Sequence, residues 1–475
     1  MYDIIIIGAG ITGSFIAHNL SKRQCKVLVI DKEADVANST SMANSAIIHA
    51  GYDPKPGTLK AKLNAPGNRM YPSVCEELGV TYKKCSAFVV AIDDEESKIL
   101  DTLKSQAADR DVTCIDHSGE DARLLEPNLS PCVIRALEFP DTGIIYPWNV
   151  AIALMEEAVL NGTELKLNEK VVDITKTSFG YSVTTSESVY ESKYVINAAG
   201  LYADKIYEMA LKGKPDYTIT PKRGEYYVLD EMATPVVSRI IYPVPGPAGK
   251  GVLVIPTIHN NILLGPNSDI VDSPEDNNNT APALNYVKQN VGKTVTNIPY
   301  DKLIRTFAGL RPSGNDGDFY IKESESLPGF VNVACIDSPG LASAPAIAEY
   351  VINDVMRDKF DYELRSEYIH RTPITYMNEL DDEAKNRLIA SDPSYGEIVC
   401  RCCLVSKGEI LDAIRRPVGA TTVKGVKKRV GPGLGRCQGG FCEPLVVDIL
   451  AKELGVDKTE VRYDSPDSVM LVSKM

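Results

Sequence analysis

Five cysteines crowd into the end of the chain, and four of them have a spacing that could hold an inorganic cofactor. Cys400-x-Cys402 and Cys437-x4-Cys442 form two pairs, separated by a helix and a loop. The glycine-rich run at residues 431–435 can bring backbone N–H groups close to sulfur. Four thiolates suit either a zinc ion or an iron–sulfur cluster, but zinc sites more often use C-x2-C knuckles. We therefore expect an iron–sulfur cluster, with zinc as the alternative.

The fifth cysteine, Cys403, directly follows a predicted ligand. Adjacent residues on a strand point to opposite sides, so we predict that Cys403 is a neighbour of the site and not a ligand. Residues 415–436 contain seven basic residues and no acidic one. These cations could stabilise an anionic cluster and dock an acidic redox partner, or they could form an ordinary solvated face.

The start of the chain carries a second pattern with chemical meaning. An apolar run at residues 2–7 leads into Gly8-x-Gly10-x-x-Gly13, a predicted helix, a second strand and then Asp31. This order is the βαβ fingerprint of dinucleotide binding: glycines let the backbone approach a pyrophosphate, and the helix N-terminus attracts it. Asp31 can accept hydrogen bonds from ribose hydroxyls. An α/β unit without a nucleotide is the alternative.

The segments that follow favour FAD over NAD. Residues 38–45 are rich in Ser, Thr and Asn and can offer hydroxyls and amides to a pyrophosphate and a flavin, although a solvated loop has the same composition. Predicted strands at residues 193–196 and 330–334 each run into a turn of small residues, where a parallel sheet meets its ligand. Such turns, spread widely along the chain, suit an extended and buried cofactor.

Composition sets the broad class of the protein. The chain has 475 residues, is 44% hydrophobic and carries a formal net charge of −13. This length predicts two or three domains, and the negative charge argues against a general nucleic-acid binder. No apolar run is long enough to span a membrane, which leaves only peripheral contact with a membrane open. Because the first strand begins at residue 2, we expect no signal peptide and a cytoplasmic protein.

The order of predicted elements divides the chain. We expect an α/β architecture in which a Rossmann-like FAD-binding domain is interleaved with an antiparallel, substrate-facing sheet over residues 1–364. A linker at 365–395, a small helical 2Fe–2S domain at 396–460 and a tail at 461–475 follow. The clearest predicted helices cover residues 59–78, 93–108, 148–161, 281–291, 342–356 and 444–454. A capping box from Ser406 to Glu409 opens another, ending at Arg416.

Taken together, these motifs resemble those of a known family. The chain is similar to FAD-dependent glycerol-3-phosphate dehydrogenases of the D-amino-acid-oxidase-like superfamily. The resemblance is closest to the anaerobic type, whose catalytic subunit ends in a domain like bacterioferritin-associated ferredoxin. It rests on Gly8-x-Gly10-x-x-Gly13, Asn44-Ser45-x3-His49-Ala50-Gly51, Phe307 to Pro312, Ser338 to Leu341 and the four tail cysteines.

Three other functions stay open from the sequence. L-2-hydroxyglutarate dehydrogenases, or other FAD-dependent 2-hydroxy acid oxidoreductases, share His-x-Gly and stretches like those at residues 59–63 and 241–245. An oxidase with a structural zinc tail is a second alternative. A non-catalytic flavo-iron–sulfur module that only relays electrons is the third.

The resemblance also implies roles for individual residues. His49 would be the base that takes the hydroxyl proton, since an unperturbed imidazole has a pKa of ~6.5. Arg311 would hold a phosphate or carboxylate through two hydrogen bonds. His259 is a further catalytic candidate, and Lys222, Arg223 and Arg305 are weaker ones. The implied partners are a phosphorylated or carboxylated alcohol and a redox protein. The implied FAD-binding residues are Gly8, Gly10, Ile11, Thr12, Gly13, Asp31, Lys32, Thr40, Ser41, Asn44, Ser45, His49, Val171, Ala199, Gly200, Gly309, Arg311, Gly340, Leu341 and Ala342.

Overall fold

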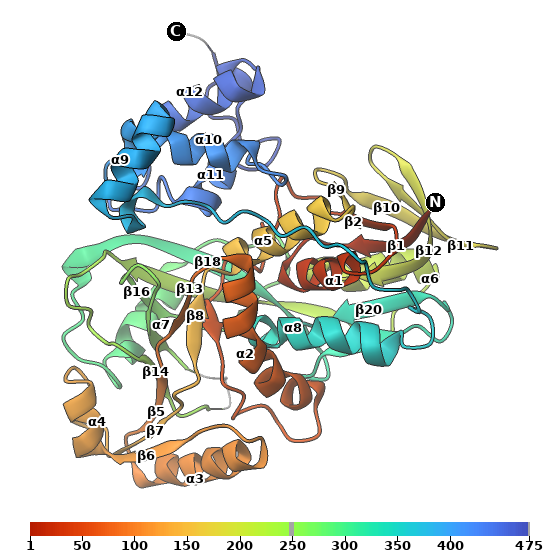
Figure 1. The fold of residues 1–475 in the computed structure, drawn as a ribbon. Helices are drawn as coiled ribbons and strands as arrows, with labels where there is room; N and C mark the ends of the chain where they lie inside the picture. The colour runs from red at the N-terminus through yellow and green to blue at the C-terminus, as the bar shows by residue number, and fades with distance from the viewer. Residues whose placement is uncertain (247–250, 474–475) are drawn as a thin grey trace.

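The computed structural model describes residues 1–246 and 251–473, so the last two residues of the predicted tail lie outside the described part. Two large sheets organise the molecule (Figure 1). The first has the strand order β10-β11-β12-β1-β2-β9, with β20 beside β12 and β19 beside β20. Its strands are β1 (Tyr2–Ile7), β2 (Val27–Ile30), β9 (Glu164–Lys166), β10 (Val171–Thr177), β11 (Gly180–Thr185), β12 (Val189–Asn197), β19 (Tyr320–Glu323) and β20 (Phe330–Ala334).

The centre of this first sheet is parallel, as the fingerprint predicts, because β1 pairs in parallel with both β2 and β12. Helices cover both faces, which explains why Ile4 to Ile7 are all apolar and buried. One face packs against α1 (Ile11–Ser21), α2 (Leu59–Leu78), α5 (Pro147–Leu160) and α8 (Gly340–Tyr350). The other packs against α6 (Ala203–Leu211).

The second sheet is mainly antiparallel and has the order β17-β13-β16-β15-β14-β5-β7-β6, with β18 beside β13. A small antiparallel sheet has the order β3-β8-β4. These strands are β3 (Ile47–Ile48), β4 (Tyr82–Lys84), β5 (Ala87–Ala91), β6 (Ile115–Ser118), β7 (Arg135–Glu138), β8 (Gly143–Ile145), β13 (Ile219–Leu229), β14 (Ile240–Pro243), β15 (Leu253–Pro256), β16 (Ile262–Gly265), β17 (Asp269–Ile270) and β18 (Leu303–Gly314).

Most predicted helices are confirmed. Thr58 caps α2 and Gly79 ends it in a left-handed conformation, as the pattern around residues 59–78 predicts. The peripheral helices are α3 (Asp94–Asp109), α4 (Gly119–Leu125) and α7 (Ala281–Val291), and short helical turns cover 200–202, 300–302, 351–355, 377–379, 393–396 and 458–460. No helix in the described ranges has the length and apolar character needed to cross a bilayer.

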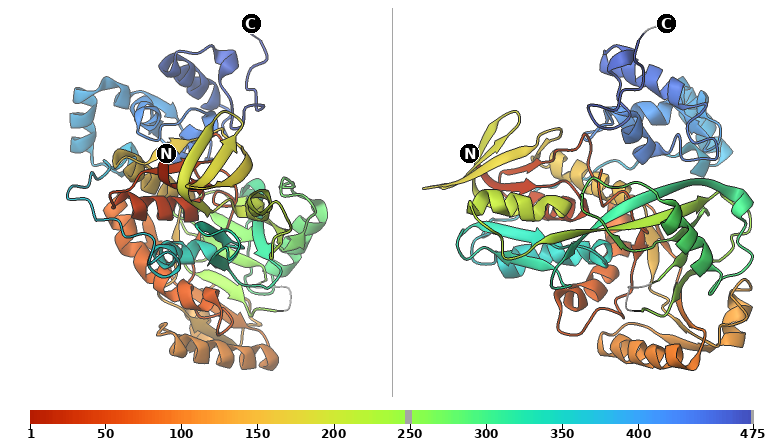
Figure 2. Two further views of the ribbon diagram at one scale, coloured as in Figure 1. Left: turned by 90° about the vertical axis from the view of Figure 1, so that its right-hand side faces the viewer. Right: turned by 180° about the vertical axis from the view of Figure 1, so that it is seen from behind.

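The end of the chain folds into a helical unit far from α3 and α4 (Figures 1 and 2). It contains α9 (Asp382–Ser391), β21 (Ile398–Cys400), β22 (Val405–Ser406), α10 (Lys407–Arg415), α11 (Val423–Val430) and α12 (Glu443–Leu454). Ile410, Val426, Val446 and Leu450 form part of its own apolar core. The predicted capping box at Ser406 and Glu409 is present. The domain limits themselves stay predictions.

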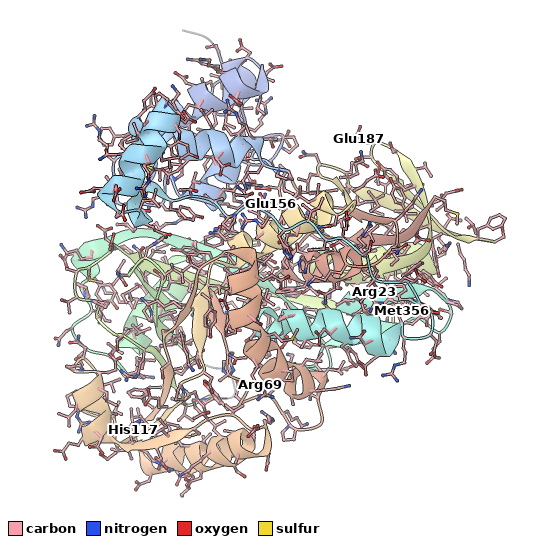
Figure 3. The ribbon with its side chains drawn as sticks, in the orientation of Figure 1. Arg23, Arg69, His117, Glu156, Glu187 and Met356 are labelled. Carbon is pink, nitrogen blue, oxygen red and sulfur yellow. The ribbon has the colours of Figure 1, made fainter. Side chains whose placement is uncertain are left out.

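The first part of the segment that we expected to be a linker, residues 365–371, is bonded to the first sheet's helices. Ile369 N–H donates to the Asn161 side chain, and the buried guanidinium of Arg371 donates to Glu156 Oε2 at 2.6 Å. Arg416, at the end of α10, donates to the other oxygen of Glu156 at 2.7 Å. One fully buried carboxylate on α5 therefore holds both the connecting segment and the helical unit; Figure 3 labels Glu156 at this junction.

A second buried carboxylate fastens α11 to the nucleotide-binding region. Asp35 accepts two hydrogen bonds from the Arg429 guanidinium, at 2.8 and 2.9 Å, and lies 2.9 Å from Lys428 Nζ. All three side chains are almost completely buried. Burial alone would raise the pKa of Asp35, but the charges of Arg429 and Lys428 outweigh it and hold the pKa well below its usual range.

We expect Asp35→Asn to loosen this junction. The substitution leaves two buried cations without their counter-charge, and breaking a buried pair typically costs about 3–5 kcal/mol. The free energy of unfolding should fall accordingly, and limited proteolysis should cut earlier within residues 365–395. Glu95→Gln, in an exposed pair with Lys98, is the matched control and should leave both readings unchanged. Wild-type stability of Asp35→Asn would show that this ion pair does not hold the junction.

Candidate functional site

A cavity of about 400 Å³ opens at the carboxyl ends of β1 and β2. Its walls include nine of the residues predicted to bind FAD: Gly8, Gly10, Asp31, Lys32, Thr40, Ser41, Val171, Ala199 and Gly200. Gly8 has φ +110°, and a Cβ there would lie 2.4 Å from Ala198 O. A Cβ at Gly13 would lie 2.0 Å from Gly8 O. The backbone is therefore packed as closely as the dinucleotide fingerprint requires, and the cavity fits the extended part of FAD.

The N-terminus of α1, which begins at Ile11, points at this cavity, and Ile11, Thr12 and Gly13 form its first turn. Ser41 Oγ accepts a hydrogen bond from Ile11 N–H at 2.9 Å, so the predicted phosphate-binding segment already touches the helix end. Asp31 accepts hydrogen bonds from Ala9 N–H and Glu33 N–H. Burial raises the pKa of Asp31 to about 6.

The predicted flavin-contacting segment packs onto the second sheet. Thr40 Oγ1 donates to Leu310 O, and Ser45 Oγ lies 3.1 Å from the Tyr226 hydroxyl. Gly309 is required here, because a Cβ would lie 1.8 Å from Ala43 O. Asn44 bonds within its own segment, donating to Thr40 O and Ser41 O. Asn44 and Ser45 thus shape the segment, which separates the cofactor cavity from the second sheet.

A larger cavity of about 1100 Å³ lies between this segment, the second sheet and the helical unit. Asn44, Ser45 and Gly309 line it, and so do Cys402 and Cys403. His259 also lines it and contacts the Tyr146 ring with the centroids 5.4 Å apart. Burial lowers the pKa of His259, so its imidazole favours the neutral form. Neither His49 nor Arg311 is among the lining residues of the two cavities.

His49 follows β3 and is buried between aromatic rings. Its Nε2 lies 3.3 Å from Asp53 Oδ1, and its Nδ1 accepts a hydrogen bond from Gly51 N–H at 3.2 Å. The Tyr52 and Tyr242 rings contact the imidazole. A neighbouring carboxylate orients the ring and stabilises its protonated form, which suits a base. Proton uptake at Nδ1 requires release of the Gly51 bond. The sequence-based interpretation missed Asp53, although its i, i+4 spacing was a signal.

Arg311 lies on β18 and crosses over Gly224 of β13. Its Nη2 is 3.5 Å from Asn267 O, and a Cβ at Gly224 would lie 2.5 Å from Nη2. Lys222 is its direct cross-strand partner, so both side chains share one face of the sheet. Neither cation forms an ion pair with any residue in the described ranges. Arg223, on the opposite face, is instead neutralised by Glu225 and Asp276.

The other side of the Gly224–Gly309 pair on this face carries an aromatic wall. Tyr226 and Phe307 stack with centroids 4.6 Å apart and an interplanar angle of 6°. Small residues thus separate the two cations from the two rings, and they make space on this face for the Arg311 guanidinium above Gly224 and for the Ala43 backbone above Gly309. The start of α8 packs against α2: Gly340 is its first residue, Leu341 O accepts a hydrogen bond from the Tyr71 hydroxyl, and Ala342 O abuts Gly67. Contact of these three residues with FAD stays a prediction.

The tail cysteines come together in two groups. The Cys400 sulfur lies within hydrogen-bonding reach of the Cys403 and Cys442 thiols, which hold its pKa well below the usual range. Cys402 lies within reach of Cys437. Backbone N–H groups converge on these sulfurs, from Gly433 to Cys400 and from Gly439 and Phe441 to Cys437. A Cβ at Gly435 would lie 2.4 Å from Cys402 Cβ, so glycine permits this close wrapping.

The arrangement of sulfurs favours a two-iron core over zinc. A zinc ion would draw all its ligand sulfurs to about 2.3 Å from one point. Among the described residues, only His18, Glu77 and Glu157 form a group of three or more potential metal ligands whose ligand atoms all lie within 4.8 Å of one another. No three cysteine sulfurs in the described ranges are that close together. The residues therefore fit a larger cluster, held by Cys400, Cys402, Cys437 and Cys442 with N–H donors to sulfur.

The argument from strand alternation, by which we predicted that Cys403 is not a ligand, is wrong. Strand β21 ends at Cys400, and residues 401–404 form a turn in which Leu404 has φ +55°. The alternation of side chains along a strand does not apply in a turn, and the Cys403 sulfur reaches Cys400. That Cys403 is not a ligand stays a prediction. Its sulfur stands beside the four predicted ligands as a fifth sulfur.

Comparison with known proteins agrees with this geometry. Residues 3–353 match the model of a family described as FAD-dependent oxidoreductase (DAO). The chain belongs to the FAD-dependent oxidoreductase family. Residues 398–452 match a BFD-like [2Fe–2S]-binding domain. The protein is thus a flavoprotein oxidoreductase with a 2Fe–2S domain, and the expected mixture of a Rossmann-like domain, a second sheet and a helical unit is confirmed.

Three similar proteins show which members of the oxidoreductase family this chain resembles. A glycerol 3-phosphate dehydrogenase of Caloramator mitchellensis is 45% identical and covers 99% of this chain and 98% of its own. The solved, FAD-bound L-α-glycerophosphate oxidase of Mycoplasma pneumoniae has a TM-score of 0.75 and 28% identity, over 79% of this chain and 99% of that one. A mitochondrial L-2-hydroxyglutarate dehydrogenase of Arabidopsis thaliana is less similar, with 28% identity over 75% of this chain and 83% of its own.

We expect FAD affinity to depend on pH through Asp31. The carboxylate accepts ribose hydroxyl donors best when ionised, and its pKa of about 6 means that protons compete with FAD below that value. The dissociation constant should be flat above about pH 7 and should rise as pH falls below 6. Flavin fluorescence quenching on titration of FAD into apoprotein measures it. Asp31→Asn should bind more weakly with no such pH dependence; an unchanged pH profile in this variant would exclude Asp31 as the cause.

Proposed function

We propose that this oxidoreductase oxidises sn-glycerol 3-phosphate to dihydroxyacetone phosphate and delivers the electrons through its 2Fe–2S domain to a partner protein. When bound, FAD accepts the hydride from the alcohol carbon and the 2Fe–2S cluster carries electrons one at a time. The chain's own residues must bind the phosphate, take the hydroxyl proton and keep the reacting atoms together. The full-length similarity to a glycerol 3-phosphate dehydrogenase supports this choice of substrate.

The observation that carries the choice is the cross-strand pair of Lys222 and Arg311. Two cations side by side on one sheet face suit a group that concentrates nearly two negative charges, as a phosphate monoester does. The two carboxylates of 2-hydroxyglutarate lie at opposite ends of the molecule and would call for separated cations. Binding of a phosphate oxygen would replace the weak 3.5 Å contact of Arg311 with Asn267 O.

Proton removal falls to His49 in this proposal. Its ring lies against Tyr242, and Tyr226 of the substrate-facing sheet belongs to the same apolar cluster, so His49 is near the sheet face that carries the cations. Asp53 supports the imidazolium that forms once the proton is taken. His259, on the wall of the larger cavity, is a candidate for guiding substrate and not for proton transfer.

The first experiment is an anaerobic screen for flavin bleaching by the purified holoprotein. Glycerol 3-phosphate should bleach the flavin, and L-2-hydroxyglutarate should not. His49→Ala should keep FAD but slow the bleaching about 10²–10⁴-fold, the usual effect of losing a general base. Bleaching by L-2-hydroxyglutarate alone would replace the proposed substrate.

The control for His49 is His117→Gln. His117 lies on β6 at the edge of the second sheet and pairs with Glu138 (Figure 3). We expect this variant to bleach at the wild-type rate. A similar loss in both variants would mean that general destabilisation, and not a missing base, explains the result.

A second experiment separates substrate oxidation from electron exit. In a Cys437→Ser, Cys442→Ser variant, the flavin should still be bleached by substrate in one turnover, because His49 and Arg311 are untouched. Sustained turnover with the physiological acceptor should be lost. Cys132→Ser, at an exposed cysteine outside the tail, is the control and should turn over normally. Normal turnover by the double variant would make the tail structural.

A further inference from the structure

Five of the seven cations in the basic stretch at residues 415–436 face inward, and only Arg415 and Arg436 are exposed, so little of the stretch is available as the partner-docking surface that we expected. Six of its seven cations are neutralised within the chain. The pairs are Arg415 with Glu453, Arg416 with Glu156, Lys424 with Asp464, Lys428 and Arg429 with Asp35, and Arg436 with Asp230. The seventh, Lys427, makes no side-chain hydrogen bond or ion pair within residues 1–246 and 251–473.

Lys427 is nevertheless buried, with only 5% of its surface exposed. Its ammonium lines the larger cavity and lies against Gly433, 3.6 Å from where a Cβ on that glycine would stand. Gly433 N–H is one of the groups that lower the pKa of the Cys400 thiol, so the ammonium is next to the shell of the predicted cluster. Burial, and then the charge of Arg305, lower the pKa of Lys427 to about 8, which leaves it mostly protonated at neutral pH.

A buried ammonium without a counter-charge is unfavourable, and this chain supplies an acidic partner for each of the other six cations of the stretch. The groups that favour the charged form of Lys427 are Glu443 and the ligand Cys442. Four thiolates and their irons form an anionic group, and each electron that enters adds one negative charge. A fixed cation beside such a group stabilises its reduced form more than its oxidised form, because charge is one of the determinants of cluster potential.

We propose that Lys427 is the built-in counter-charge of the iron–sulfur cluster and raises its reduction potential, so that the cluster accepts electrons from the flavin side. The proposal rests on the cluster that the proposed function includes. Lys427 acts here as a positioning charge and touches neither substrate nor flavin. Glu443, at the first turn of α12, carries a negative charge near the same cluster and would therefore lower its reduction potential.

The test is the midpoint potential of the cluster, from a redox titration of the holoprotein followed by the electron paramagnetic resonance signal of the reduced cluster. Lys427→Gln should lower the potential by about 59 mV, a tenfold change in the one-electron equilibrium constant. Lys427→Arg should restore it. Lys424→Gln is the matched control: it removes a cation one turn earlier on α11 that Asp464 already neutralises, and it should leave the potential unchanged. The flavin potential, read from absorbance in the same titration, should be the same in all variants.

Glu443→Gln provides a second test with the opposite sign, because loss of the acidic group should raise the cluster potential. It also decides the matter if Lys427→Gln fails to load the cluster. Unchanged potentials in loaded Lys427→Gln and Glu443→Gln proteins would overturn the role of Lys427 and would leave an anion in the cavity, between Lys427 and Arg305, as its counter-charge. Absence of iron and sulfide from the wild-type protein would instead overturn the cluster in the proposed function.

Discussion

Buried charge at the junction between the flavoprotein body and the 2Fe–2S unit governs how this molecule is put together. Asp35 must neutralise Lys428 and Arg429, and Glu156 must neutralise Arg371 and Arg416. A buried carboxylate has strict requirements for distance and direction, since any shift leaves charges uncompensated in a medium that does not hydrate them. The two units therefore have one preferred arrangement, where an apolar interface would tolerate sliding.

The same constraint ties the junction to the cofactor. Asp31 and Asp35 stand four residues apart, one on the wall of the cofactor cavity and the other in the ion pair with α11. Asn38, a little further on, bonds to Asp464 of the helical unit, and Ser41 bonds to the first helix. One short segment thus touches the dinucleotide site, the second sheet and the 2Fe–2S unit. Its conformation is determined by all three, which makes it the natural place for them to influence one another.

Much of the fold could be predicted from the sequence, because several elements are specified by residues close to one another in the chain. The fingerprint glycines, the helix at residues 59–78 and the capping box at Ser406 depend on signals within a few residues, and all were interpreted correctly. Helix α11 was missed as a helix, although Val423, Val426 and Val430 follow a helical spacing, because its four cations resemble a solvated loop. Two of those cations, Lys428 and Arg429, are buried against Asp35, which lies 394 residues before Arg429 in the sequence, and no local pattern reports such a partner.

The same limit applies to the candidate site. The residue types were predictable, but the cross-strand register that pairs Lys222 with Arg311 depends on how β13 and β18 align. The turn at residues 401–404 replaced an expected continuation of a strand and brought Cys403 back to Cys400, because Leu404 adopts a left-handed conformation. Long-range register and single-residue backbone choices are decided by tertiary packing, which explains why the roles of Lys222, Asp53 and Cys403 were underestimated.

The segment that joins the two units has a consequence for kinetics. Ile369 and Arg371 are held by Asn161, by Glu156 and by the backbone of Leu78, so the connection has no slack. A domain on a loose tether can swing between an electron donor and an acceptor, and its turnover then depends on how often it visits each. Here the cysteine loop and the flavin-facing segment border one cavity at a set separation. In the proposed function, electrons would cross that gap by tunnelling over a constant distance, and the diffusive event would be the arrival of the external acceptor.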